Sequence, residues 1–208
     1  VRELIETLLL TVVIFFGVRL VVQSFRVDGP SMLPNLHTNQ LVIVNKALYW
    51  HISDDGPLAK VAQGPDTGLG HKFVFRAPRR GEVIVFRAPL DPDRDYIKRV
   101  IGVPGDTVEI RDGKVWVNGK RLHEPYLSPD VYTEASGEVG SRVTVPQENL
   151  FVLGDNRPGS SDSRDWGFVP LGNVIGKAMF IYWPVRDWGG IAHAWIPSTF
   201  RWARLAPA

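Results

Sequence analysis

The chain of 208 residues contains no cysteine, which excludes disulfides, thiol nucleophiles and cysteine-based metal sites. Its formal net charge is only +2, without the basic stripe that marks a nucleic-acid interface. Its five histidines are scattered and lack metal-ligand spacing, which disfavours a metal site or a histidine-based triad. We therefore expect no metal, no cofactor and no nucleic-acid partner. The histidines are His37, His51, His71, His123 and His193.

Long apolar runs are also scarce, and the one that stands out covers residues 4–22. It approaches the roughly 20 residues that a helix needs to cross a bilayer. Glu6 and Arg19, near its ends, can reach a headgroup layer. A cleaved signal peptide is one alternative, but no small-x-small site follows the run. An amphipathic helix of a soluble domain is another, but residues 7–18 have no polar face. We interpret residues 1–24 as a transmembrane anchor.

Beyond the anchor, short alternating runs separated by glycine and proline predict a mainly β, antiparallel domain over residues 25–208. Asp112-Gly113 and Asn118-Gly119 predict two tight hairpin turns. Residues 53–80 are rich in glycine and proline and predict a weakly structured insertion. We expect core packing for most of the late tryptophans, with Trp195 and Trp202 as candidates for contact with the bilayer. The expected strands are residues 40–45, 82–87, 96–101, 107–120, 142–145, 150–153 and 174–183.

Ser31 lies in a stiff segment, because Pro30 precedes it, Pro34 follows it and Gly29 permits unusual dihedrals. A serine on such a turn can present its hydroxyl and its own N–H to the same point. The N–H could then stabilise the oxyanion of a tetrahedral intermediate. A plain turn explains the segment equally well.

Lys98 lies in a predicted strand whose alternation puts it on one face with Tyr96. A lysine can act as a base only if its pKa falls from about 10.4 towards neutrality, and burial among apolar groups lowers it. Taken alone, the residue is better explained as an edge-strand lysine that points into water. Residues 154–170 complete the pattern, since a polar, glycine-containing loop runs directly into an apolar Trp-Gly-Phe-Val-Pro.

Three segments, taken together and in this order, resemble those of bacterial type I signal peptidases. These are membrane-anchored Ser/Lys endopeptidases that remove signal peptides from exported proteins. The resemblance runs from the anchor to about Trp183 and leaves out residues 53–80 and the last twenty or so. The matching positions are residues 29–34, residues 98–106, residues 154–157, Ser160, Asp162, Ser163, Arg164 and residues 166–170.

The resemblance implies a role for each matching residue. Ser31 would be the nucleophile and Lys98 the general base, with Ser160 holding the lysine amine by a hydrogen bond. The N–H of Ser31 would contribute to the oxyanion hole beside Gly29, where some members carry a serine. Two ion pairs would support the site, Asp162 with Arg164 and Arg99 with Asp155. An extended substrate would lie in shallow pockets for small side chains, along strands beginning at Phe25 and Asp95. The residues implied for these pockets are Phe25, Val27, Leu36, Val42, Tyr96 and Ile97.

Two positions depart from the family pattern. Asn35 replaces the usual threonine, and Asp28 puts a carboxylate beside the site, where we expect it to point away. The expected activity is cleavage of exported preproteins after an Ala-x-Ala-like site, on the extracytoplasmic side of the plasma membrane. The implied partners are therefore signal-peptide-bearing preproteins and the lipid bilayer.

Two other interpretations stay open. A self-cleaving protease of the SOS-repressor type also uses a serine and a lysine, but it would lack a membrane anchor. An anchored β-domain binding protein with an inactive site would lack the serine or the lysine, and both are present.

Overall fold

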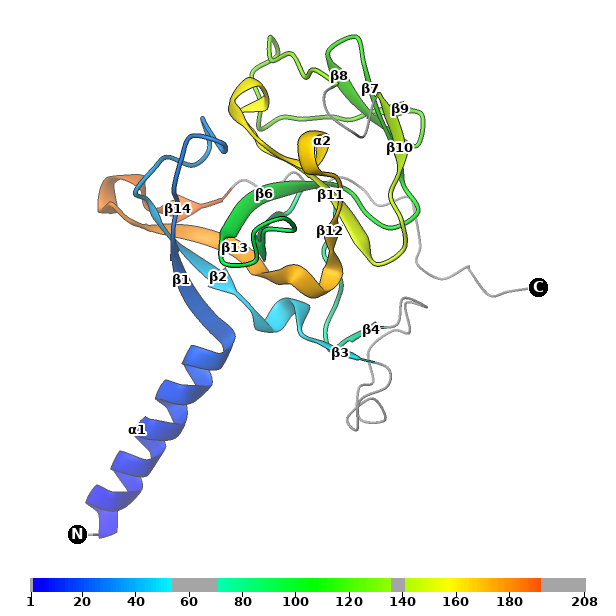
Figure 1. Ribbon diagram of the computed structural model, residues 1–208. Coiled ribbons are helices and arrows are strands. Elements are labelled where there is room, and N and C mark those ends of the chain that lie inside the picture. Colours follow the sequence, from blue (N-terminus) through cyan, green and yellow to red (C-terminus); the bar gives the residue numbers. More distant parts are fainter. Residues whose placement is uncertain (1, 54–70, 136–140, 192–208) are drawn as a thin grey trace.

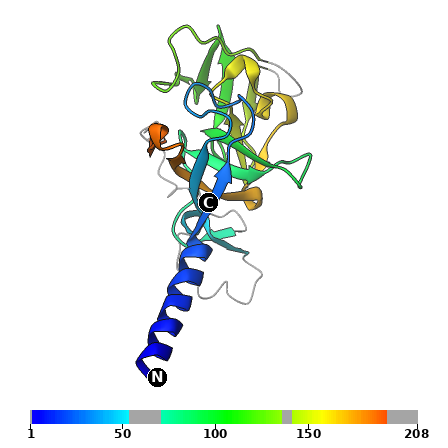
Figure 2. The same cartoon turned by 90° about the vertical axis from the view of Figure 1, so that its left-hand side faces the viewer.

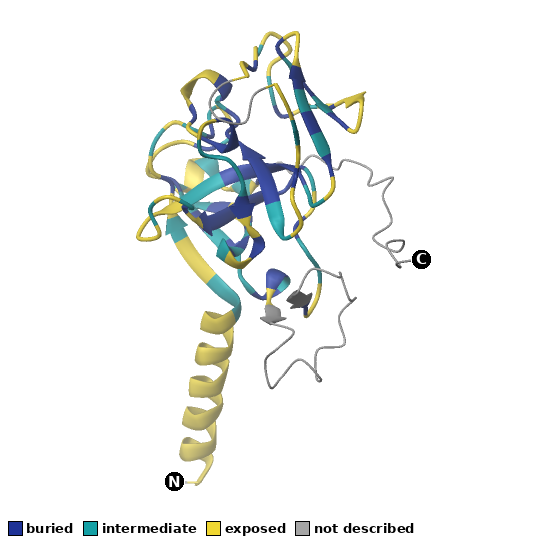
Figure 3. Ribbon diagram, turned by 45° about the vertical axis from the view of Figure 1, so that its right-hand side comes forward, coloured by how far each residue is buried: buried dark blue, intermediate teal, exposed yellow. Residues whose placement is uncertain are grey.

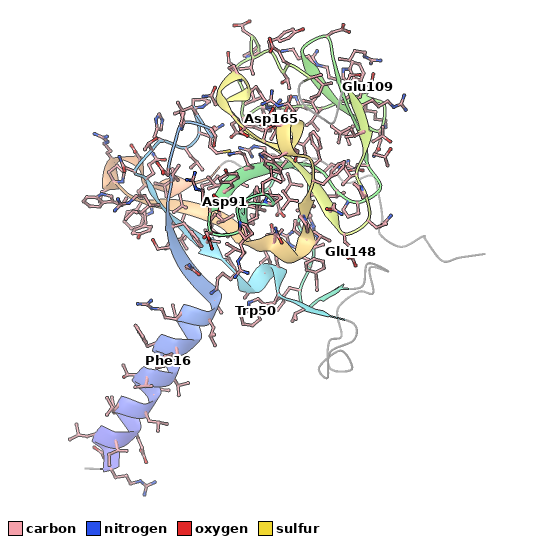
Figure 4. The ribbon with its side chains drawn as sticks, viewed as in Figure 1. Phe16, Trp50, Asp91, Glu109, Glu148 and Asp165 are labelled. Atoms are coloured by element: carbon pink, nitrogen blue, oxygen red, sulfur yellow. The ribbon has the colours of Figure 1, made fainter. Side chains whose placement is uncertain are left out.

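One long helix and a β domain make up the computed structural model, which describes residues 2–53, 71–135 and 141–191. Helix α1 (Arg2–Val21) projects away from the β domain and buries none of its residues (Figures 1 and 2). Its Phe16 side chain points away from the helix axis, clear of every strand (Figure 4). By length and composition, α1 can cross a membrane. The chain passes directly from α1 into strand β1 (Val22–Arg26), without a linker.

The main sheet has eight strands and curves strongly around the centre of the domain (Figure 1). Its order is β1-β2-β13-β5-β6-β11-β12, with β14 paired to β13, and all its pairs are antiparallel. The remaining bounds are β2 (Leu41–Asn45), β5 (Val83–Arg87), β6 (Asp95–Gly102), β11 (Asn149–Leu153), β12 (Val169–Pro170), β13 (Val174–Trp183) and β14 (Gly189–Gly190).

Two smaller sheets complete the β structure. One has the order β10-β7-β8-β9 and the other pairs β3 with β4. The hairpin turns predicted at Asp112-Gly113 and Asn118-Gly119 are confirmed, because all four residues have positive φ. The bounds are β3 (His51–Ser53), β4 (His71–Phe73), β7 (Thr107–Arg111), β8 (Lys114–Val117), β9 (Lys120–Arg121) and β10 (Arg142–Thr144). The short helices are η1 (Ala47–Tyr49), η3 (Arg157–Gly159), α2 (Ser163–Trp166), η4 (Leu171–Asn173) and η5 (Val185–Asp187).

Buried residues are concentrated in the strands at the centre of the domain (Figure 3), and two hydrophobic clusters pack on the two faces of the main sheet. Strand β5 shows why, since Val83 and Val85 pack into one cluster while Ile84 and Phe86 pack into the other. Its partner β6 is likewise buried from Lys98 onward. A residue in the middle of these strands is therefore shielded from water whichever way it points.

The structure confirms the predicted mainly β, antiparallel class and corrects some details. Residues 53–80 were expected to have little structure, but β4 pairs with β3 and Phe73 is buried. Residues 54–70 of this insertion lie outside the described residues. The core packing expected of the tryptophans is wrong for Trp183 and Trp188, which are 55% and 69% exposed. Trp195 and Trp202 lie outside the described residues.

Candidate active site

The turn that carries Ser31 is held by buried core residues of its own segment and by hydrogen bonds from Asn156. Met32 and Leu36 are fully buried in the core, and the Leu36 N–H donates to the Met32 carbonyl. From the side, the Asn156 N–H donates to the Ser31 carbonyl at 3.0 Å, and its side-chain amide donates to the Pro30 carbonyl at 3.1 Å. Gly29 has φ +82°, a left-handed conformation that favours glycine. The half-buried Ser31 side chain is thus held in place.

Lys98, on a central strand of the main sheet, contacts this serine. Its Nζ donates to Ser31 Oγ at 2.8 Å, and its side chain is buried. Its strand β6 lies between β5 and β11, so the interpretation of Lys98 as an edge-strand lysine is wrong. The predicted shared face with Tyr96 is confirmed, since Nζ lies 5.4 Å from the centre of the Tyr96 ring.

Burial lowers the pKa of the Lys98 amine from 10.5 to about 8, because the charged form loses its hydration. The negative charges of Asp162 and Asp155 act in the opposite direction and limit the fall. A substantial fraction of the amine is therefore neutral near pH 8. A neutral amine at this distance can take the proton of a serine hydroxyl, which makes the oxygen a nucleophile.

The ion pair expected between Asp162 and Arg164 is present and buried, with Nε and Oδ1 2.8 Å apart. The Arg164 guanidinium also donates to the Ser160 carbonyl at 3.1 Å and to the Arg157 carbonyl at 2.6 Å. Asp162 accepts a hydrogen bond from the Gly154 N–H at 3.0 Å. The pair therefore fixes both ends of the loop that approaches Ser31.

The second expected pair, Arg99 with Asp155, is also present, and neither side chain is exposed. The guanidinium donates to both carboxylate oxygens, at 2.8 and 2.7 Å. It also stacks on the Tyr126 ring, with Cζ 3.8 Å from the ring centre. Asn35 adds a further donor to the same carboxylate, at 2.8 Å.

Ser160 does not form the hydrogen bond that was expected with the Lys98 amine. Its Oγ is buried and has no hydrogen-bond partner among the described residues. This hydroxyl packs against Gly154, where an added Cβ atom would lie 2.1 Å from it. Lys98 Nζ instead bonds to Ser31 Oγ.

A cleft of about 250 Å³ opens beside Ser31 and Lys98. It includes six of the seven residues expected to bind substrate. Leu36 is the exception, because it is fully buried in the core below the turn. Asp28 is among the residues that line the cleft, but the causes that shift the Lys98 pKa are burial, Asp162 and Asp155, and do not include Asp28. The lining residues are Phe25, Arg26, Val27, Asp28, Ser31, Val42, Val85, Asp95, Tyr96, Ile97, Lys98 and Ser161.

Sequence reasoning missed Arg26, Val85 and Ser161 in this lining. Val85 faces the cleft because it pairs with Ile97 across β5 and β6. Only the register of these strands reveals this, and the register is not visible in either strand alone. Among the residues that the structure describes, no group of three or more histidine, aspartate or glutamate side chains is arranged to hold a metal ion.

Fold and site together define a class, namely a mainly β protein with one candidate membrane helix and a cleft that ends at a serine and a buried lysine. The sequence model for the signal peptidase family, peptidase S26, matches residues 1–183. The chain belongs to this family.

Curated relatives agree with this assignment. A signal peptidase I from Bacillus caldolyticus is 38% identical over 176 residues, which cover 80% of this chain and 82% of the relative. A signal peptidase I from Leptolyngbya laminosa is 36% identical over 197 residues, which cover 90% of this chain and 82% of the relative. A crystal structure of a signal peptidase I from Enterococcus faecalis is 38% identical, with a TM-score of 0.43 and coverage of 49% of this chain and 97% of that chain.

Proposed function

We propose that this chain is a membrane-anchored serine endopeptidase that removes signal peptides from exported preproteins, with Ser31 as nucleophile and Lys98 as general base. The observation that carries the proposal is the 2.8 Å contact between Lys98 Nζ and Ser31 Oγ, made by an amine whose pKa burial lowers to about 8. The family membership and the names of the curated relatives support the choice of substrate.

The reaction follows from this geometry. Ser31 Oγ attacks the carbonyl carbon of the scissile bond while its proton passes to the Lys98 amine. The Ser31 N–H, beside Gly29, stabilises the oxyanion of the tetrahedral intermediate. The Lys98 ammonium then protonates the leaving amine, and the neutral amine finally activates the water that hydrolyses the acyl-enzyme.

Substrate binding in this proposal uses the exposed backbone of the sheet. Strand β1 is the end of the main sheet, so one of its edges is not paired within that sheet. An extended peptide can add to such an edge and place alternate side chains into pockets. The small volume of the cleft, about 250 Å³, favours small side chains, as in an Ala-x-Ala-like site.

Membrane anchoring completes the proposal, with residues 1–24 as the anchor and residues 25–208 as the catalytic domain. Phe25 lies four residues beyond Val21, the end of α1. At about 3.3 Å per residue in a strand, the cleft therefore begins about 13 Å from the end of the helix. Cleavage sites of preproteins emerge next to the bilayer, so tethering raises the effective concentration of enzyme there. We place the catalytic domain on the extracytoplasmic side of the plasma membrane.

The test is cleavage of a model preprotein by the purified full chain, with the cut site read by mass spectrometry. We expect one cut after the Ala-x-Ala site by the unmodified chain, and none above background by Ser31→Ala. Ser128→Ala is the matched control, because Ser128 lies on an exposed loop outside the active-site cleft, and it should cleave normally. Cleavage of the enzyme's own chain but not of the preprotein would favour a self-cleaving protease. Binding without any cleavage would favour an inactive binding protein.

A further inference from the structure

Asn35 occupies the position where the family usually has threonine, and the structure shows what its side chain does. Its N–H donates to the Met32 carbonyl at 3.0 Å, so it belongs to the same turn as Ser31. Its side-chain amide donates to Asp155 Oδ2 at 2.8 Å and to the Tyr126 carbonyl at 2.9 Å. One amide group therefore joins the Ser31 turn to two other segments.

The carboxylate that Asn35 contacts is central to the site. Asp155 is also bound by Arg99, which is the direct neighbour of Lys98 on β6. The connection from the serine to the lysine therefore runs through Asn35, Asp155 and Arg99. Every link in it is buried or half-buried. Movement of Asn35 would change the distance between Ser31 and Lys98.

Asp155 also acts on Lys98 through its charge, which favours the ammonium form of the amine. A hydrogen bond donated to a carboxylate stabilises its negative charge and offsets part of its field. The donor from Asn35 thus favours the neutral amine that proton transfer requires. Asp162 is the other carboxylate that acts on Lys98, and its charge is balanced by Arg164. The remaining charged residues of the cleft are Arg26, Asp28 and Asp95.

We propose that Asn35 is a positioning residue, which holds the Ser31 turn against Asp155 and offsets the charge of this carboxylate beside Lys98. This inference rests on the proposed roles of Ser31 and Lys98. Asparagine suits the task better than threonine, because its amide has two N–H donors for two acceptors while a hydroxyl has only one. The hydrogen bonds from Asn156 keep the turn attached when Asn35 is changed, so Asn35→Ala should shift Ser31 without releasing it.

The test compares the pH dependence of kcat and kcat/KM for cleavage of the model preprotein by full-length variants. In Asn35→Ala we expect kcat to fall about tenfold, since small misplacements of reacting groups have large effects on rate, while KM changes little. The rise of the rate with pH should also move to higher pH, because the Asp155 charge is less offset. Asn35→Thr, which keeps one donor, should lie between Asn35→Ala and the unmodified chain.

Asn118→Ala is the matched control. The Asn118 amide donates at 2.8 Å to Asp106, a carboxylate that is paired with Arg80 and does not act on Lys98. Asn118 also has φ +53°, so alanine there adds backbone strain. This variant should lose at least as much thermal stability as Asn35→Ala and yet keep the unmodified pH profile.

The outcomes separate the two proposals. Activity in Ser31→Ala would overturn the proposed function itself. If Ser31→Ala is inactive but Asn35→Ala keeps the unmodified kcat and pH profile, the positioning role is wrong. The same holds if Asn35→Ala and Asn118→Ala change kcat and the profile alike, because the effect is then only structural. If Asn35→Ala fails to fold, Asn35→Thr decides, and an unshifted profile in that variant overturns the inference.

Discussion

At the scale of single residues, Lys98 combines a buried position with a group that is normally charged. The fall of its pKa from an ordinary 10.5 to about 8 is the net result of burial, which disfavours the ammonium, and of the Asp162 and Asp155 charges, which favour it. The difference corresponds to about 3 kcal/mol, at 1.36 kcal/mol per pKa unit. The same burial that makes Lys98 a usable base therefore makes the folded chain less stable near neutral pH.

Replacing Lys98 by an apolar residue of similar size should abolish activity and raise the stability of the folded chain. Below pH 8 the amine is protonated in the folded and unfolded states, so the folded chain carries the full penalty. Between about pH 8 and 10.5 the unfolded chain binds more protons, so stability of the unmodified chain rises with pH. We expect Lys98→Met to be inactive and to gain about 1–3 kcal/mol in the free energy of unfolding at pH 7, a gain that shrinks towards pH 10.5. Urea denaturation measures it.

Lys177→Met is the informative comparison for this prediction. Lys177 Nζ lies 3.0 Å from Glu82, a carboxylate whose pKa is about 2 because, although burial raises it, hydrogen bonds from Arg76, Tyr49 and Lys177 lower it further. Removal of this amine takes a partner from a buried charge and should lower stability. If both lysine variants lost stability at pH 7, the penalty assigned to Lys98 would be wrong.

The rate of cleavage should depend on pH through the same amine. In the proposed mechanism only neutral Lys98 can accept the Ser31 proton, so kcat/KM should rise about tenfold per pH unit below pH 8 and level off above it. Lys98→Arg should be inactive at every usable pH, because arginine does not lose its proton. A pH series with the model preprotein checks both. A rate that still climbs near pH 10, or activity in Lys98→Arg, would contradict the assignment.

At the scale of elements, the loop between β11 and α2 (residues 154–162) is held close to the Ser31 turn, and Gly154 makes this approach possible. A Cβ atom there would overlap the Ser160 side chain and would lie 2.5 Å from the Ser31 carbonyl oxygen. The side chain could move by changing its rotamer, but the backbone carbonyl could move only by displacing the turn.

Gly154→Ala should therefore push the Ser31 turn away from Lys98. We expect at least a hundredfold loss of kcat/KM, because a displacement of about 1 Å is enough to cost that much. The matched control is Gly172→Ala, since no atom lies within 4 Å of a Cβ built there. That variant should retain activity. The comparison uses preprotein cleavage rates and the melting temperatures of both variants. A near-normal rate in folded Gly154→Ala would show that the loop can move away without displacing the Ser31 turn.

The elements differ in how far the sequence could predict them. Residues 174–183 were predicted as one strand, and β13 has these bounds. Strands β12 and β14 were missed because two residues carry no periodicity. The two ion pairs were expected from the family resemblance and are present. The Asn35 contact with Asp155 was not foreseen, because it joins residues 120 positions apart through the tertiary fold.

At the scale of the whole molecule, the helix and the cleft lie at the two ends of one short strand. β1 begins directly after α1, and Phe25 on β1 already lines the cleft. The resemblance could suggest an anchor and a serine–lysine pair, but it could not give the distance between helix and cleft. That distance depends on where α1 ends and how β1 joins the sheet. If α1 anchors the chain as proposed, the short β1 strand keeps the cleft close to the membrane surface.

Charges in the middle of α1 should therefore separate membrane attachment from catalysis. An arginine at the centre of a membrane helix costs about 2.5–3.5 kcal/mol on insertion scales. Because α1 buries none of its residues, Leu9→Arg with Val13→Arg should leave the β domain folded. We expect this variant to be released by alkaline carbonate extraction, whereas Leu9→Ala with Val13→Ala stays in the membrane. The arginine variant should still cut a soluble peptide with an Ala-x-Ala site but should process membrane-inserted preprotein poorly. Resistance to extraction would mean that another surface holds the chain on the bilayer, and equal processing of both substrates would mean that tethering contributes nothing to the reaction.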